Sequence, residues 1–359
     1  FGPQTPKLTG QQNLASAVRE LLGSEMMYQD LAPTGKEAKS VPKFFAIARK
    51  MIFIALIRGL KRQCSGDITV VDMVHSLATL DNKRARDRLI VLGHDSYALR
   101  AWRDFKASRL SVRKARLLIS WIGWRFIEVL LRHLAWRVFF VSPIDSRNAI
   151  GSSFDNVLAI PISANLCDAG VRLRTQGQLR RGSPRILVSL PVTNFSQSVI
   201  DLALVSRLLD IASSRAEITL WGKGAAPLCK ALNNLPSSVR IVEWVENYTA
   251  FVASFDVLVY PRMVGSGFHT KLAEALVLGV PCVCVDWVAT PLSLAGYDGI
   301  TTFKDSESFS RAIAEFLDVY DSGGIQRKPA IPAKSAAREA LAPLTRAILQ
   351  AMKEQGSPK

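Results

Sequence analysis

The sequence predicts an α/β protein made of two domains, each a parallel β-sheet flanked by helices. Short runs rich in Val, Ile and Leu alternate along the chain with longer helical segments. Several of these runs end in glycine, proline or histidine, as strands do at the carboxyl edge of a parallel sheet. With 359 residues, 48% of them hydrophobic, the chain is long enough for two ordinary cores.

The most informative stretch is 255–286, which reads FDVLVYPRMVGSGFHTKLAEALVLGVPCVCVD. It predicts a strand, a glycine loop, a helix and a second strand, in that order: 256–260, 265–267, 270–278 and 280–285. A glycine loop that opens a helix presents backbone N–H groups beside the positive end of the helix dipole. Such an arrangement suits a phosphate group.

Two charged residues follow this loop on one face of the predicted helix. Lys271 places a cation on the first turn, and Glu274 lies three residues later. A carboxylate beside a diphosphate site is well placed to accept hydrogen bonds from sugar hydroxyls. The simpler alternative is an ordinary strand–loop–helix unit whose glycines only form the turn.

The composition limits the compartment and the kind of partner. A net charge of +16 implies an anionic partner: nucleic acid, anionic lipid or a phosphorylated substrate. The five cysteines lie mostly in apolar strings, so we expect reduced core thiols in a cytosolic protein and no metal site. No secretory signal is visible, and no uncharged apolar run reaches the roughly 18 residues of a membrane-spanning helix.

Two basic segments of the first half also carry many large apolar side chains. Residues 42–62 predict an amphipathic helix with six Lys or Arg and no acid, and residues 98–136 contain four tryptophans among basic residues. This composition is typical of a helix on an anionic membrane surface. A core helix with a solvated basic face, or a nucleic-acid patch, is the alternative. For 98–136 we favour the membrane because the aromatic residues lie among Leu, Ile and Val, whereas for 42–62 the membrane helix and the core helix are about equally favoured.

Two predicted strands of the first half end in histidine, at His75 and His94. Parallel strands place both imidazoles at the carboxyl edge of one sheet, where doubly wound folds bind ligands. A single histidine at such a position is more often structural, but the pair favours a binding role.

Taken together, these motifs resemble glycosyltransferase family 4, whose members have the GT-B fold: two Rossmann-like domains facing across a cleft. The specific part runs from Pro261 through the Gly-x-Gly loop and Lys271-x-x-Glu274 to Gly279-x-Pro281. The broader resemblance covers most of the chain. It implies four parts: an N-terminal acceptor-side domain at 1–166 whose first strand we expect to be truncated, a linker at 167–184, a donor domain at 185–325, and a terminal helix at 333–355 that returns to the first domain.

The resemblance also implies the site residues. The catalytic residues would be His94, Lys271 and Glu274. The donor-binding residues would be Thr9, Gly10, Lys223, Val245, Gly265, Ser266, Gly267, Phe268, His269 and Thr270. No cofactor or metal is implied, since the nucleotide diphosphate sugar is itself the substrate.

Two features depart from the usual family pattern. Ser266 stands where members carry the first of two glutamates, and residues 189–194 lack the usual Arg and Lys. A subset of the family instead uses Gly-x-Gly-x-x-x-Lys, which is present here at Gly265, Gly267 and Lys271.

The implied activity is retaining, metal-independent transfer of a sugar from a nucleotide diphosphate sugar to a lipid-linked or polysaccharide acceptor. We expect a cytoplasmic protein, peripheral at the inner face of an anionic membrane, with no nucleic-acid partner. A GT-B-fold scaffold without turnover is the alternative, and a nucleic-acid-binding protein is the least favoured hypothesis.

Overall fold

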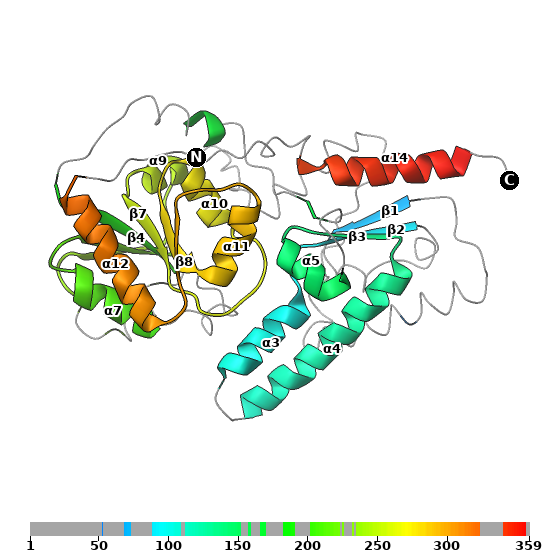
Figure 1. Ribbon diagram of the computed structural model, residues 1–359, viewed down its shortest axis with the longest axis horizontal. Helices are drawn as coiled ribbons and strands as arrows, with labels where there is room; N and C mark the ends of the chain where they lie inside the picture. Colours follow the sequence, from blue (N-terminus) through cyan, green and yellow to red (C-terminus); the bar gives the residue numbers. More distant parts are fainter. Residues whose placement is uncertain are drawn as a thin grey trace, which may run out of the picture. The chain divides into compact units, whose positions relative to one another are not determined.

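The computed structural model describes residues 52, 68–72, 88–108, 112–151, 157–158, 166–169, 182–190, 202–222, 225, 232, 235–323 and 340–356. The chain divides into two compact units (Figure 1). Unit 1 comprises Phe1–Pro161, Gly265–Phe268 and Lys334–Lys359, and unit 2 comprises Ile162–Val264 and His269–Ala333. Outside the described residues lie Thr9, Gly10, His75, Lys223 and, apart from Ile52, the helix predicted at 42–62.

Unit 2 is built on a six-stranded sheet in which all neighbouring strands are parallel. Its strands are β4 (Arg185–Ser189), β5 (Glu217–Trp221), β6 (Val239–Val242), β7 (Val257–Tyr260), β8 (Cys282–Val285) and β9 (Ile300–Phe303). The spatial order β6-β5-β4-β7-β8-β9 is the doubly wound order 3-2-1-4-5-6. The winding therefore reverses between β4 and β7, and the loop after β7 emerges at the edge where such sheets bind ligands.

Helices follow these strands, as parallel connections require. They are α7 (Leu202–Ala212), α9 (Tyr248–Ala253), α10 (Thr270–Val277), α11 (Asp286–Leu294) and α12 (Ser306–Asp321). All four residues of β7 and of β8 are buried, which explains their unbroken apolar sequences. The helix predicted at 270–278 is confirmed as α10, one residue shorter.

Unit 1 contains a parallel sheet of order β1-β2-β3 among the described strands. Its elements are β1 (Ile68–Asp72), β2 (Arg88–Gly93), α3 (Tyr97–Ala107), α4 (Val112–Leu134), β3 (Arg137–Phe140), α5 (Pro143–Ile150) and α14 (Ala342–Gly356). Beyond α5, Val157 forms a single parallel bridge to Phe140.

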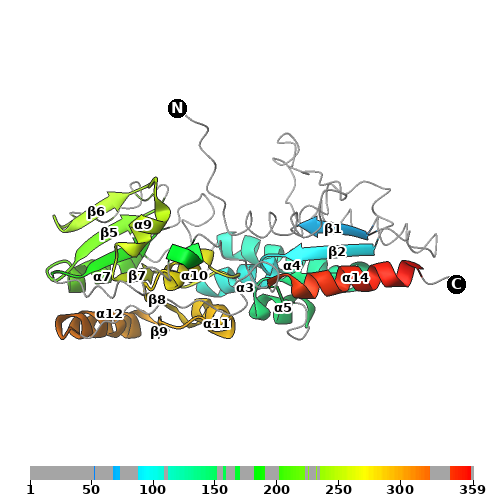
Figure 2. The same ribbon diagram turned by 90° about the horizontal axis from the view of Figure 1, so that it is seen from above.

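The alternation of β2 divides the core of unit 1 into two layers. Leu89 and Val91 face one cluster with residues of α4 and α5, and Ile90 and Leu92 face another with residues of α14. In both views α14 runs along the strands (Figures 1 and 2). Arg88, at the start of β2, pairs with Glu354 of α14 at 2.7 Å. None of the described helices, including the 23-residue α4, is long and apolar enough to cross a membrane.

Candidate functional site

The glycine loop joins β7 to α10. Gly265 and Gly267 have φ angles of 147° and 89°. Residues with a side chain rarely adopt such backbone angles, so both positions favour glycine. The helix begins at Thr270 with His269 as its N-cap, and the His269 side chain makes no capping hydrogen bond. The first N–H groups of α10 are therefore not occupied by a side-chain cap, as an anion-binding helix start requires.

Ser266 lies within this loop and is only 6% exposed. Its hydroxyl has no hydrogen-bond partner among the described residues. A buried hydroxyl without a partner is costly, so its position indicates that a ligand or water satisfies it. Ser266 is the residue that stands in place of the family's first glutamate.

Neighbouring residues of unit 1 hold the loop segment Gly265–Phe268. Arg103 Nη1 donates to the Gly265 carbonyl at 2.7 Å, and the Gly267 N–H donates to Asp145 Oδ2 at 3.0 Å. Phe268 packs against the apolar cluster beneath α14. These contacts fix the backbone of the loop on both sides of Ser266.

Lys271 projects over an aromatic ring. Its Nζ lies 4.1 Å from the ring centroid of Trp221, the last residue of β5. This is a cation–π contact. None of the ion pairs between described residues involves Lys271. Burial lowers the pKa of Lys271, while the charge of Glu274 opposes that shift. The ammonium donors are thus held in place without being consumed by a carboxylate.

Glu274 lies beside the buried hydroxyl of Tyr248, the first residue of α9. The Tyr248 hydroxyl interacts with the Glu274 carboxyl group. Burial raises the pKa of Glu274, and the Tyr248 hydroxyl and the Lys271 charge counteract the rise. Burial and the nearby carboxylate raise the pKa of Tyr248 well above its usual value.

His269 is oriented by a short polar chain. Arg262 Nη1 donates to the Tyr260 hydroxyl oxygen at 2.9 Å, and that hydroxyl lies 3.2 Å from His269 Nδ1. The Tyr260 hydroxyl therefore links the Arg262 guanidinium to the His269 ring. The Trp287 ring packs edge-on against His269 with centroids 5.4 Å apart. The position of the imidazole is therefore fixed by Tyr260 and Trp287.

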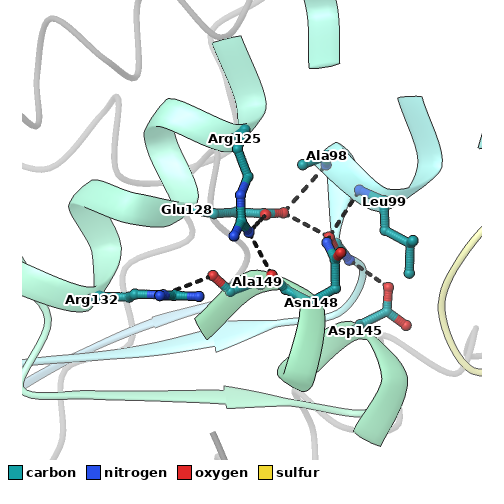
Figure 3. A network of polar contacts seen from close by, with 9 residues as sticks. Ala98, Leu99, Arg125, Glu128, Arg132, Asp145, Asn148 and Ala149 are labelled. Carbon is teal, nitrogen blue, oxygen red and sulfur yellow. Dashed lines mark hydrogen bonds and ion pairs between the residues drawn. The ribbon is translucent and has the colours of Figure 1, made fainter. Parts of the chain in front are cut away.

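His94 follows β2 and is 6% exposed. A polar network fixes the chain just beyond it (Figure 3). The Ser96 hydroxyl and the Ala98 N–H donate to Glu128 Oε1 at 2.8 and 3.3 Å, and the Ser96 N–H donates to Asp145 Oδ1 at 2.8 Å. Burial raises the pKa of both carboxyls.

The same network ties α5 to α4. Asn148 Nδ2 donates to the Ser96 hydroxyl at 3.0 Å, and Arg125 Nη1 donates to the Asn148 carbonyl. Arg132 Nε donates to the Ala149 carbonyl at 3.1 Å (Figure 3). Together these bonds hold the start of α3, and with it the loop that carries His94.

The predicted site residues thus fall into two groups. Unit 2 holds His269, Thr270, Lys271 and Glu274 at the start of α10, and a half-buried Val245 after β6. Unit 1 holds His94 and Gly265–Phe268. The roles assigned to these residues remain predictions.

Sequence reasoning missed the aromatic residues that contact Lys271, Glu274 and His269. Trp221 directly precedes another Gly-x-Gly string, Gly222-Lys223-Gly224, which was the available signal for it. Tyr248, Tyr260 and Trp287 had no comparable signal, because their relation to α10 depends on how the sheet and helices pack.

Comparison with known proteins agrees with the two-domain α/β fold. Residues 197–318 match the family described as Glycosyl transferases group 1. No curated protein sequence matches the chain. Among solved structures, the chain is similar to sucrose-phosphate synthase from Thermosynechococcus elongatus, with 13% identity and a TM-score of 0.53 over 89% of this chain and 81% of that one.

Two further structures have TM-scores of 0.50. One is a glycosyltransferase from Rickettsia africae, at 14% identity over 98% of this chain and 95% of that one. The other is Anabaena HepE in complex with UDP, at 15% identity over 84% and 82%. At such identities the likeness establishes the fold alone. The chain therefore has the GT-B fold, and over residues 197–318 it is similar to the group 1 glycosyl transferases.

Proposed function

We propose that this protein is a glycosyltransferase that transfers a sugar from a nucleotide diphosphate sugar to an acceptor hydroxyl, with retention of configuration. The start of α10 carries the proposal. There, left-handed glycines lead into a helix without a side-chain cap, and Lys271 and Glu274 lie on its first turns. The match to group 1 glycosyl transferases includes this whole segment.

The proposed chemistry follows from the charges at this helix start. When the glycosidic bond breaks, negative charge develops on the β-phosphate of the leaving nucleoside diphosphate. The N–H groups of Thr270 and Lys271, together with the Lys271 ammonium, would oppose that charge from fixed positions. We propose that these groups, rather than a divalent cation, neutralise the diphosphate.

Three other side chains are assigned to the sugar-bearing part of the donor and to the acceptor. Glu274 would accept hydrogen bonds from donor hydroxyls, and the buried Ser266 hydroxyl would bond to the donor sugar. His94 would bind a sugar or acceptor hydroxyl. Since HepE is described in complex with UDP, UDP is the first nucleotide to test.

We further propose a lipid-linked or polysaccharide acceptor at the cytoplasmic face of a membrane, with the protein bound peripherally. The net charge of +16 and the basic, apolar helices of unit 1 support this location. A non-catalytic GT-B scaffold is the competing function, favoured by the serine at position 266.

The donor site is tested by thermal stabilisation and calorimetry with UDP, GDP, ADP, TDP and CMP in the presence of a metal chelator. Lys271→Met keeps the apolar stem over Trp221 and removes the charge. Lys304→Met, at a side chain that is 80% exposed, is the matched control.

One nucleoside diphosphate should stabilise the wild type and the control. Its affinity should fall about tenfold to hundredfold in Lys271→Met, since hydrogen bonds to charged groups contribute roughly 1.5–3 kcal/mol. Binding that is unchanged in Lys271→Met would refute the assigned site. Binding of none of the nucleotides would favour the scaffold.

A further inference from the structure

We propose that one face of α4 is the surface by which this protein docks on an anionic lipid membrane. The face consists of the apolar stripe: Val112, Ala115, Ile119, Ile122, Phe126 and Val129. The biological meaning of this docking rests on the proposed function, because it would bring the transferase to a membrane-borne acceptor. The lipid contact itself is measured separately from donor binding.

The stripe follows from the spacing of its residues. Steps of three and four residues place all six side chains on one side of the helix. From Val112 to Val129 the stripe extends about 26 Å at the helical rise of about 1.5 Å per residue. Five of the twelve exposed large hydrophobic side chains among the described residues lie on it. Such a contiguous apolar patch on a protein surface indicates an interaction site.

Exposure along the stripe is graded. Val112 is 72% exposed, Ile119 56%, Phe126 47% and Val129 38%. The exposed fraction decreases from the N-terminal end of α4 toward the strands. The reason is that the N-terminal part of α4 and the paired α3 extend beyond the sheet of unit 1 (Figure 1). The most exposed end of the stripe is therefore the end farthest from the core.

The opposite side of α4 is already occupied. Ile127 and Leu131 belong to the buried cluster against the sheet. Trp121 packs against Trp102 with ring centroids 4.9 Å apart, and Trp124 stacks on Tyr97 at 4.5 Å. These tryptophans, which suggested a membrane from composition alone, serve packing within unit 1. The exposed residues are Ile, Val and Phe instead.

The charge around the stripe is positive. The helix α4 carries five Lys or Arg and one Glu, and that Glu128 is 3% exposed and bonded within the network around Ser96. Arg116 flanks the stripe on one side of the helix. Arg125 and Arg132 lie on the other side, where their guanidinium groups also donate to carbonyls of α5 and Arg125 pairs with Glu128 at 3.5 Å. At the ends of α3 and α4 that meet, Lys106 and Lys114 lie over aromatic rings.

This charge pattern selects the occupant. Two copies packed stripe to stripe would bring the positive charges of two α4 helices together, and like charges across an interface oppose association. An anionic lipid surface neutralises the arginines and receives the apolar side chains at the headgroup boundary. The complementarity of both charge and polarity therefore favours lipid over a second copy.

Vesicle sedimentation of the full chain tests this docking surface. Vesicles contain either phosphatidylcholine alone or phosphatidylcholine with about 30% phosphatidylglycerol, and the salt concentration is varied. The stripe variant combines Ile119→Ser, Ile122→Ser and Phe126→Ser. The matched control combines Leu349→Ser and Met352→Ser on α14, which are 53% and 55% exposed. Arg116→Gln tests the charge.

The wild type and the control should bind anionic vesicles, with weaker binding at high salt. The stripe variant should bind at least about tenfold more weakly, since each lost apolar side chain reduces burial in the membrane. Arg116→Gln should bind about fivefold more weakly to anionic vesicles, and its binding to neutral vesicles should not change. All variants should keep the wild-type far-ultraviolet circular dichroism and response to nucleotide.

Three results would overturn the docking surface: wild type that stays in the supernatant with both lipids, a stripe variant that binds like wild type, or a lipid-free wild-type dimer that the stripe variant abolishes. The last result would assign the stripe to a second copy. Because nucleotide binding is measured on the same samples, failure of docking is distinguishable from failure of the donor site.

Discussion

Units 1 and 2 both bury charged side chains beyond the ends of parallel strands, but they satisfy those charges differently. In unit 1, Glu128 and Asp145 accept hydrogen bonds from N–H groups and hydroxyls of the chain itself. In unit 2, Lys271 lies over the ring of Trp221, and Glu274 lies beside a single phenol.

This difference separates a structural charge from one that is available to a ligand. A carboxylate that accepts several hydrogen bonds from its own chain holds that chain in place. It has little capacity left to accept hydrogen bonds from a ligand. An ammonium held against an aromatic face keeps its three donors for an anion. Raised or lowered pKa values occur in both units, so the partners of a buried charge, rather than the shift itself, distinguish the two roles.

The largest expected effect tests the structural side of the comparison. Glu128→Ala removes the acceptor for the Ser96 hydroxyl and the Ala98 N–H, and should cost about 3 kcal/mol of unfolding free energy. Glu128→Gln keeps an acceptor oxygen and should cost less than about 1 kcal/mol. Urea unfolding, followed by tryptophan fluorescence, measures both variants. Equal losses in the two would contradict this assignment, as would a lost nucleotide response in the folded Gln variant.

The same pair has a pH signature. Burial raises the folded-state pKa of Glu128 above its ordinary value of 4.5, so the folded protein binds this proton more tightly than the unfolded chain. Stability should therefore fall as pH rises from about 4.5 through the folded-state pKa. Glu128→Gln has no titrating carboxyl group at this position, so its stability should fall less steeply as pH rises. The pKa values of Asp145 and Glu274 are also raised in the folded protein. These two groups should therefore preserve part of the pH dependence of stability in Glu128→Gln.

A smaller effect is expected where the unit 1 network reaches the glycine loop. A Cβ at Gly267 would lie 1.8 Å from Asp95 Oδ1, whereas a Cβ at Gly323 would meet nothing within 4 Å. Both glycines have positive φ, 89° and 74°, so alanine carries a backbone cost of roughly 1–2 kcal/mol at either position.

Gly267→Ala should therefore destabilise the protein more than Gly323→Ala and should also weaken the nucleotide response. Thermal unfolding with and without UDP measures both quantities. Equal loss of stability in the two variants would show that Asp95 yields to the added methyl group and that the loop is not tightly held.

Much of the local structure was predictable, because each signal lies within one element. The glycines at 265 and 267 and the apolar strings on either side predicted the loop, the start of α10 and the two flanking strands. The contact of Lys271 with Trp221 was not predictable, since these residues are 50 positions apart and meet only through the order of the sheet.

The face of α4 shows a second limit. Periodicity identifies which residues share one side of a helix, but the tryptophans and the isoleucines both form such a side. Only the packing of Trp121 on Trp102 and of Trp124 on Tyr97 shows which side turns inward. Composition therefore suggested a membrane surface, and the packing shows which residues of α4 are exposed to form the surface that we propose.

The smallest expected effect tests the ligand side of the comparison. Tyr248→Phe removes the hydroxyl beside Glu274 and should cost only about 1 kcal/mol of stability. That hydroxyl lowers the pKa of Glu274, so its loss raises the pKa further above the ordinary value of 4.5. The carboxylate then protonates at a higher pH on acidification.

If donor binding needs the ionised carboxylate, the acidic limb of nucleotide-sugar affinity should move to higher pH in Tyr248→Phe, with affinity above that limb nearly unchanged. Calorimetry across pH measures the limb, and Tyr320→Phe on α12 is the control. A limb that does not move would mean that Glu274 does not contact the donor as an anion. Lys271 would then be the only charged side chain on the first turns of α10 still assigned to the donor, and the contrast with the saturated carboxylates of unit 1 would rest on the cation alone.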